Sequence, residues 1–142
     1  MSMTNYLENS LLQLLLNGTA IANIADNAAT SPATQYYLSL HTADPGEAGD
    51  QTTSEIAYTD YARVAVARTT AGWSVTGNIA SPVDDVEFPL GTGGGGSATY
   101  VGIGTADSGA GTLLLVGELA TPIVCGAGVI PRLTSASTIT FD

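Results

Sequence analysis

His41 is the residue best suited to acid–base chemistry, and it is the one histidine in the chain. General-base catalysis with a serine, or zinc binding together with Cys125, would depend on this single imidazole. His41 ends a strand-like run and is followed by Thr42-Ala43-Asp44-Pro45, a turn-forming sequence. We therefore expect its ring to form hydrogen bonds that fix a turn. We expect the lone Cys125 to be a small buried hydrophobic residue.

The acidic segment from Asp44 to Glu55 partly matches a calcium-binding loop. It has aspartate, glycine and glutamate at the first, sixth and twelfth positions. Gly46 and Ala48, however, stand where the third and fifth ligands should be, and neither flank resembles a helix. Two readings stay open, a weak surface cation site that uses Asp44, Asp50 or Glu55 and a solvated acidic loop. No tightly bound metal is expected.

Gly91, Gly93 and Gly96 satisfy the glycine pattern of dinucleotide-binding loops. In those loops a helix follows and holds the pyrophosphate, whereas a strand-like run follows here. The chain also contains no lysine, which excludes a P-loop. We expect a flexible loop from Gly91 to Ser97, and no cofactor.

Aromatic residues are spread along the strand-like runs and could form either a sugar-stacking platform or anchors in a core or an interface. Because each buries a large area, the anchor reading is the expected one. The candidate interface aromatics are Tyr36, Tyr37, Tyr61, Trp73 and Tyr100.

Arg63 and Arg68 lie an odd number of residues apart, so a regular strand would place them on opposite faces. A single arginine against one carboxylate is therefore expected, rather than a paired anion clamp. No paired acids and no nucleophile–base set are recognisable, although two carboxylates distant in sequence could still converge. The expectation is a protein without enzymatic activity.

The charge balance excludes nucleic acid as a partner. Thirteen acidic residues oppose three arginines, and the formal net charge is −10. A phosphate backbone would be repelled. The leucine run from Leu11 to Leu16 is far shorter than the ~20 residues that span a bilayer, so no membrane segment is expected. Charged residues make up only 11% of the chain, so small neutral polar side chains must cover most of the surface. A surface of this kind suits packing against other protein.

Leucine spacing predicts one amphipathic helix from Tyr6 to Leu16. Asn5 and Glu8 have the spacing of a capping box, and Asn17-Gly18 supplies the helix stop. A helix this short is marginal alone, so its leucine face must pack on a neighbouring subunit or on the chain's own sandwich. The candidate docking residues are Leu7, Leu11, Leu14 and Leu15.

Short runs rich in β-branched and aromatic residues follow, separated by Gly, Pro and Asp. They predict an all-β fold, an antiparallel β-sandwich of jelly-roll type with one short N-terminal α-helix. The helix and an extended arm would occupy residues 1–34, and the sandwich residues 35–142. The expected strands are residues 36–41, 61–69, 72–76, 86–89, 98–105, 112–120, 123–125, 128–133 and 137–141.

Several segments of the chain resemble a family of small virion structural proteins of tailed bacteriophages. The resemblance lies in Asn5 to Leu12, Leu38 to Pro45, Tyr61 to Val66 and Tyr100 to Leu119, with a closing Gly128-Val129-Ile130-Pro131 and a final alternating strand. Members of this family are capsid decoration or tail-fibre-like proteins, and the family has no catalytic residues to transfer.

The resemblance implies a cement protein as the first expectation. Such a protein is made in the host cytoplasm, binds the major capsid protein lattice at the capsid surface, and stabilises it. Self-association is also expected, with a trimer preferred. A tail or tail-fibre component, active in receptor binding or assembly, is the alternative. A glycan-acting enzyme or a lectin is the third reading.

Overall fold

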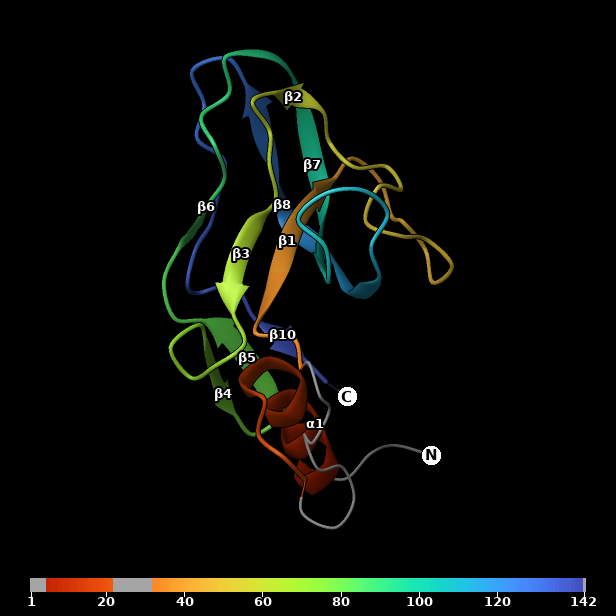
Figure 1. Cartoon of the computed structure of the whole chain (residues 1–142). Coiled ribbons are helices and arrows are strands. Elements are labelled where there is room, and N and C mark those ends of the chain that lie inside the picture. The colour runs from red at the N-terminus through yellow and green to blue at the C-terminus, as the bar shows by residue number, and fades with distance from the viewer. Residues whose placement is uncertain (1–4, 22–31, 142) are drawn as a thin grey trace. The chain divides into compact units, whose positions relative to one another are not determined.

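The structure is a computed structural model that describes residues 5–21 and 32–141. Those residues form one short helix and ten strands in antiparallel sheets (Figure 1). This confirms the predicted all-β class, while the jelly-roll connection pattern stays a prediction. The chain divides into two compact units. Unit 1 comprises Met1–Gln35, Val66–Asp85 and Thr134–Asp142, and unit 2 comprises Tyr36–Ala65 and Val86–Leu133.

Unit 1 packs the helix against a small sheet. Helix α1 (Asn5–Asn17) contacts β4 (Trp73–Thr76) and β5 (Ile79–Pro82), and β10 (Ile139–Thr140) completes the sheet in the order β10-β5-β4. The fully buried side chains of this unit include Leu12, Leu16 and Trp73. The helix therefore belongs to a hydrophobic core of its own chain.

Both ends of α1 lie within one residue of the predicted bounds. Gly18 has a φ of 66°, which confirms the predicted left-handed stop, and the Thr19 amide donates to the Gln13 carbonyl at 3.0 Å. The last turn carries no basic residue, but the Arg68 guanidinium donates to the Leu15 carbonyl at 2.7 Å. Its charge complements the negative end of the helix dipole. Within the described residues, no helix has the length and apolar character to cross a membrane.

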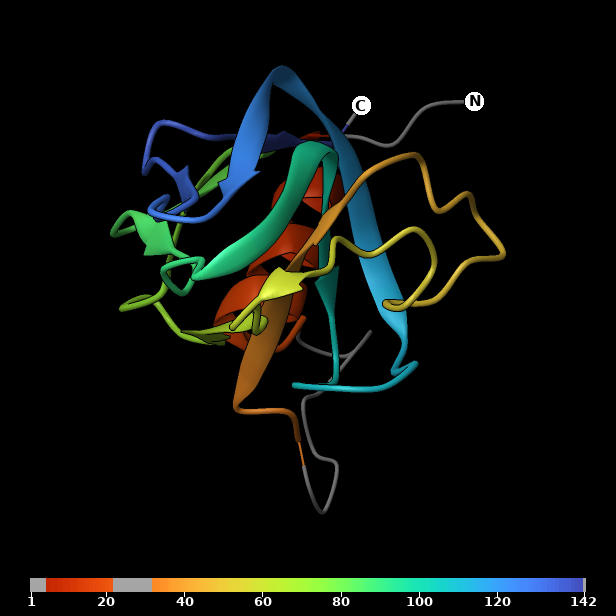
Figure 2. The ribbon, with the colours of Figure 1, turned by 90° about the horizontal axis from the view of Figure 1, so that it is seen from above.

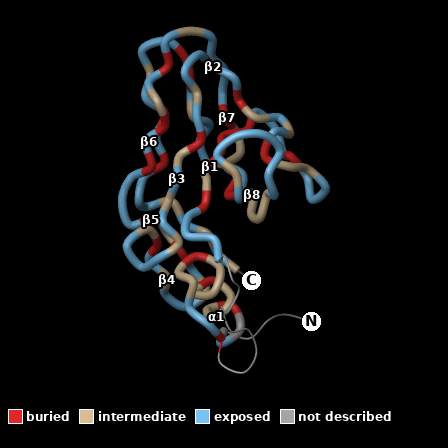
Figure 3. The backbone as a smooth tube through the Cα atoms, viewed as in Figure 1, coloured by how far each residue is buried: buried red, intermediate tan, exposed pale blue. Residues whose placement is uncertain are grey.

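Unit 2 contains most of a five-stranded sheet. Its strands are β1 (Gln35–His41), β2 (Tyr58–Thr59), β3 (Val64–Ala67), β7 (Gly93–Gly104) and β8 (Leu113–Gly126). The order is β2-β7-β1-β3, with β8 paired to β7, and β6 (Val86–Glu87) pairs separately with β9 (Arg132–Leu133). In the β1–β7 register Leu38 lies opposite Ile103, and both are buried. Figure 3 shows buried stretches along the tube of unit 2. The central strands therefore contribute to the core.

The predicted flexible loop from Gly91 to Ser97 is wrong, because β7 already begins at Gly93. The glycines permit strands to approach closely: Gly95 pairs with Gly126, and a Cβ on Gly95 would lie 2.6 Å from the Cys125 carbonyl oxygen. Glycine composition resembles that of a linker, but here it marks a close backbone contact.

Other strand predictions differ in extent. The strands expected at residues 112–120 and 123–125 are one irregular strand, β8, and those expected at 128–133 and 137–141 shrink to β9 and β10. Strands β2 and β5 are absent from the prediction, because each is short and borders turn residues. Most of the predicted arm lies outside the described residues, and the boundary at residues 34 and 35 stays a prediction.

Candidate functional site

Glu55 and Arg63 form a buried ion pair in unit 2, with Arg63 Nε 2.7 Å from Glu55 Oε1 and Nη2 2.8 Å from Oε2. The Arg63 side chain is 2% exposed. Nη1 also donates to the Ala106 carbonyl at 2.9 Å, and Nη2 donates to the Gly109 carbonyl at 2.8 Å. Hydrogen bonding to Glu55 raises the pKa of Arg63. The pair ties the loop of residues 42–57 to the loop of residues 105–112.

Tyr61 extends this network. Its hydroxyl donates to Glu55 Oε1 at 2.9 Å and accepts from the Leu40 amide at 3.1 Å. Burial raises the pKa of Tyr61 far above its usual range, so the hydroxyl keeps its proton. The expected single arginine against one carboxylate is thus confirmed for Arg63, in a more extensive network than the sequence suggested.

Gln51 makes a second connection between the same two loops. Its side chain is fully buried, its amide oxygen accepts from the Ala106 amide at 2.9 Å, and its own backbone N–H donates to the Ala110 carbonyl at 2.9 Å. A Cβ on Gly104 would lie 2.1 Å from the Gln51 amide carbon. Glycine at 104 therefore creates the space that Gln51 fills.

His41 has the hydrogen-bonding role expected from its position. Nδ1 donates to the Thr53 carbonyl at 2.8 Å, and Nε2 lies 2.8 Å from Ser39 Oγ. Burial lowers the pKa of His41, which favours a neutral ring that accepts from the serine hydroxyl. Ser39 and His41 have the spacing of a nucleophile and its base, but both are 0% exposed. A substrate could contact neither, so the pair serves to hold the turn.

The carboxylates of the acidic loop have separate local partners. Asp44 accepts from the Gly46 amide at 2.8 Å, and Asp50 accepts from the Thr52 amide at 2.8 Å, whereas Glu55 binds Arg63. The Thr52 hydroxyl also donates to Asp50 and lowers the pKa of this exposed carboxyl. Across the described part of the chain, His, Cys, Asp and Glu form no group of three that could hold a metal ion.

The candidate interface aromatics occupy different environments. Tyr36 and Trp73 are buried, at 5% and 2% exposure. Tyr37, Tyr61 and Tyr100 are half-buried, and Trp73 belongs to unit 1 whereas the tyrosines belong to unit 2. Their interface role stays a prediction. Cys125 is buried, as expected, and burial raises its pKa.

The candidate docking leucines lie on α1 beside its buried stripe. Leu12 and Leu16 are 0% exposed, while Leu11, Leu14 and Leu15 are half-buried. Leu7 lies in the helix, but its side chain is outside the described set. The contacts of α1 with β4 and β5 agree with the reading in which the helix covers its own chain, and the docking role stays a prediction.

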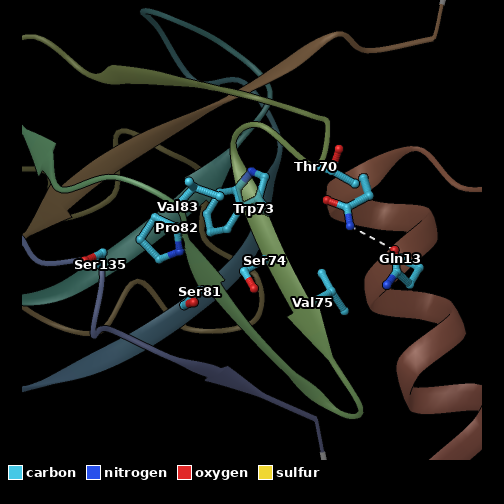
Figure 4. A pocket seen from close by; sticks show the side chains of 10 residues that line it. Gln13, Thr70, Trp73, Ser74, Val75, Ser81, Pro82, Val83 and Ser135 are labelled. Atoms are coloured by element: carbon cyan, nitrogen blue, oxygen red, sulfur yellow. Dashed lines mark hydrogen bonds between the residues drawn. The ribbon is translucent and has the colours of Figure 1, made fainter.

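Unit 1 contains a surface pocket of about 600 Å³ between the C-terminal half of α1 and the hairpin of β4 and β5 (Figure 4). Hydroxyl and amide groups dominate its lining, and none of the lining side chains is ionisable. The side-chain amides of Asn17 and Gln13 lie 2.8 Å apart and are hydrogen-bonded at one side. The lining residues are Gln13, Asn17, Thr70, Trp73, Ser74, Val75, Ser81, Pro82, Val83 and Ser135. Such a pocket suits an uncharged polar ligand.

The sequence predicted that an arginine would pair with a carboxylate, but it did not identify Glu55 as the partner of Arg63, and it gave no sign of the pocket. Glu55 and Arg63 lie eight residues apart across an irregular loop, and no periodic pattern joins them. The pocket collects residues from three separate stretches of the chain, so its neutral lining has no local signal. The small number of arginines was the one indirect sign of the ion pair. In the structure each of the three arginines has a carboxylate or a carbonyl partner.

A comparison with protein families finds a match over nearly the whole chain. The family model described as podophage GP4 fiber I protein gp80 matches residues 2–140. No curated protein matches the chain. The match supports a virion structural protein and favours the fibre alternative over the capsid-cement expectation. The chain belongs to the podophage GP4 fiber I protein gp80 family.

Proposed function

We propose that this protein is a structural subunit of a podophage tail fibre. The observation that carries the proposal is the family match, which extends over residues 2–140 and so includes both compact units. Synthesis in the host cytoplasm would be followed by assembly into the virion, at the tail rather than on the capsid surface.

The construction of unit 2 supports this role. Two surface loops are joined by the Arg63–Glu55 ion pair and by Gln51, and these contacts hold the loops in a defined position. Binding residues in many proteins lie on loops that a rigid scaffold positions. The weakly charged composition, with 11% charged residues, also suits extensive contact with other protein.

Fibre and cement roles predict opposite phenotypes in virions that lack the protein. For a fibre subunit, such virions should keep their DNA on heating and osmotic shock but adsorb poorly to host cells. Densitometry of intact virions should show far fewer copies than of the major capsid protein. A copy number near that of the capsid protein, with early DNA loss and normal adsorption, would instead support cement and a capsid partner.

We further propose that the protein binds rather than catalyses. Its one histidine is fully buried, and Glu55 is engaged by Arg63 and Tyr61. Purified protein incubated with host-surface polysaccharide should leave the chain-length distribution unchanged by mass spectrometry. Shortened polysaccharide that persists after a second purification step would contradict this.

A receptor-binding contribution is the second candidate function, and the neutral pocket of unit 1 favours it. Uncharged oligosaccharides present many hydroxyls and would match its Ser, Thr, Asn and Gln groups. Titration calorimetry with neutral and with sialylated oligosaccharides should show binding of the neutral set only. Thr70→Asp, in the lining, should abolish binding, whereas the exposed control Thr76→Asp on β4 should not.

A further inference from the structure

The indole N–H of Trp73 is a buried donor in the lining of the unit 1 pocket. Trp73 is 2% exposed, and among the described residues its Nε1 atom has no hydrogen-bond acceptor. Buried polar groups in folded proteins are almost always paired, and an unpaired one is costly. An indole N–H can donate but cannot accept. A donor of this kind in a pocket wall is suited to an acceptor on a ligand.

Regular structure fixes the position of this donor. Trp73 begins β4, and its backbone N–H donates to the Thr69 carbonyl at 3.0 Å. Helix α1 contacts both strands of the β4–β5 hairpin, and Figure 1 and Figure 2 both show the helix beside it. Two other residues of the lining, Thr70 and Val83, are exposed. Exposed side chains change rotamer within nanoseconds, so a ligand oxygen can reach the indole N–H.

Apolar carbons and an amide pair lie in the same lining as the indole. Residues two apart in a strand share a face, so Trp73 and Val75 lie on one face of β4, and Pro82 lies opposite Trp73 in the register. The hydrogen-bonded side-chain amides of Asn17 and Gln13 line the pocket from α1. Figure 4 shows Gln13 on the helix and Val75 on the hairpin. The pocket therefore presents one unpaired donor, an apolar wall and an amide pair to a ligand.

We infer that the pocket binds the acetamido group of an uncharged N-acetylated amino sugar, with Trp73 Nε1 as the donor to its carbonyl oxygen. An amide carbonyl accepts and does not donate, so it matches a group that can only donate. The acetyl methyl packs against Val75 and Pro82, and the acetamido N–H donates to an amide oxygen of the Asn17–Gln13 pair. This inference rests on the proposed receptor-binding role and names the class of sugar for it.

The wild-type chain allows a direct test, because Trp73 is its only tryptophan and gives a single indole N–H signal in a proton–nitrogen NMR spectrum. The full chain is titrated with N-acetylglucosamine and N-acetylgalactosamine, and with glucose and galactose as controls. Each sugar differs from its control only in the group on the second ring carbon. The acetamido sugars should move the indole proton downfield, slow its exchange with water, and bind at least about tenfold more tightly than the hexoses.

Variants test the two polar contacts separately. Trp73→Phe keeps an aromatic ring but removes the donor, and it should weaken binding of the acetamido sugars by about tenfold. Gln13→Ala removes one amide of the pair and should also weaken binding by about tenfold. Ser10→Ala, one helical turn earlier and outside the lining, is the matched control and should bind as wild type does. If Trp73→Phe does not fold, the wild-type titration and the two helix variants still decide.

Three outcomes would overturn the inference: equal affinity for acetamido sugars and hexoses, binding that leaves the indole signal unchanged, or no binding of any of the four sugars. The first two leave the receptor-binding role intact, because a neutral sugar still binds. After the third, calorimetry with neutral oligosaccharides separates the two failures, since binding there would keep the receptor role without the acetamido contact. The fibre role itself is tested independently, by the virion experiment.

Discussion

Arg63 and Glu55 are joined by two parallel hydrogen bonds, and the arginine also donates to two carbonyls in the loop of residues 105–112. One guanidinium therefore links the acidic loop to the β7–β8 connection. A buried bidentate pair is specific in geometry, and loss of either partner leaves the other charge without compensation.

Arg63→Met should lower the free energy of unfolding by about 3 kcal/mol, because it leaves the carboxylate of Glu55, whose side chain is only 16% exposed, without its countercharge. Arg132→Met is the matched control, since the Arg132–Glu87 pair is about half exposed on both sides. That control should cost no more than about 1 kcal/mol. Urea unfolding measures both, and similar losses for the two variants would contradict the prediction.

Stability should fall as pH drops below neutrality. Burial lowers the pKa of His41 from its ordinary value of 6.5, so the folded state favours the neutral ring. The contribution of His41 to the free energy of unfolding is complete above pH 6.5. It is lost as the pH falls through 6.5 towards the lower pKa that His41 has in the folded state. The chain has no second histidine, so His41→Gln should show a flat profile in this window. Thermal unfolding from pH 8 to pH 5, within the range of about 5–8 where histidine titrates, checks it.

Gly104→Ala should destabilise unit 2 by about 1–3 kcal/mol, because the new Cβ would overlap the Gln51 amide. Gly96→Ala on the same strand is the control, since its Cβ would meet the nearest atom, Ile56 Cδ1, at an ordinary 3.8 Å. Adding Gln51→Ala to Gly104→Ala should recover part of the loss. Chemical denaturation would disprove the overlap if the double variant were less stable than either single variant.

Leu16→Ala should lower the free energy of unfolding by about 2–5 kcal/mol, since the Leu16 side chain is fully buried in unit 1. Leu14→Ala, at a half-buried docking candidate, should cost clearly less in the same unfolding experiment.

If α1 is a docking element, Leu14→Ala should reduce incorporation into virions while the isolated protein stays folded. Normal incorporation of a folded variant lacking residues 1–18 would rule out docking.

The sequence by itself determined the elements that local chemistry encodes. Leucine spacing and Gly18 specified the helix and its end, and alternation of β-branched residues indicated most strands. The composition, together with the segments that resemble phage virion proteins, pointed to a virion protein. These features are readable because each depends on residues within a few positions of one another.

Only the tertiary structure decided which distant residues meet. It brought Arg63 to Glu55, set Gln51 against Gly104, and converted the glycine run after Gly91 into a strand. It also placed α1 on β4 and β5, and left β8 at a sheet edge. Such contacts depend on strand register and loop closure, which follow from the packing of the whole unit and have no local periodicity in the sequence.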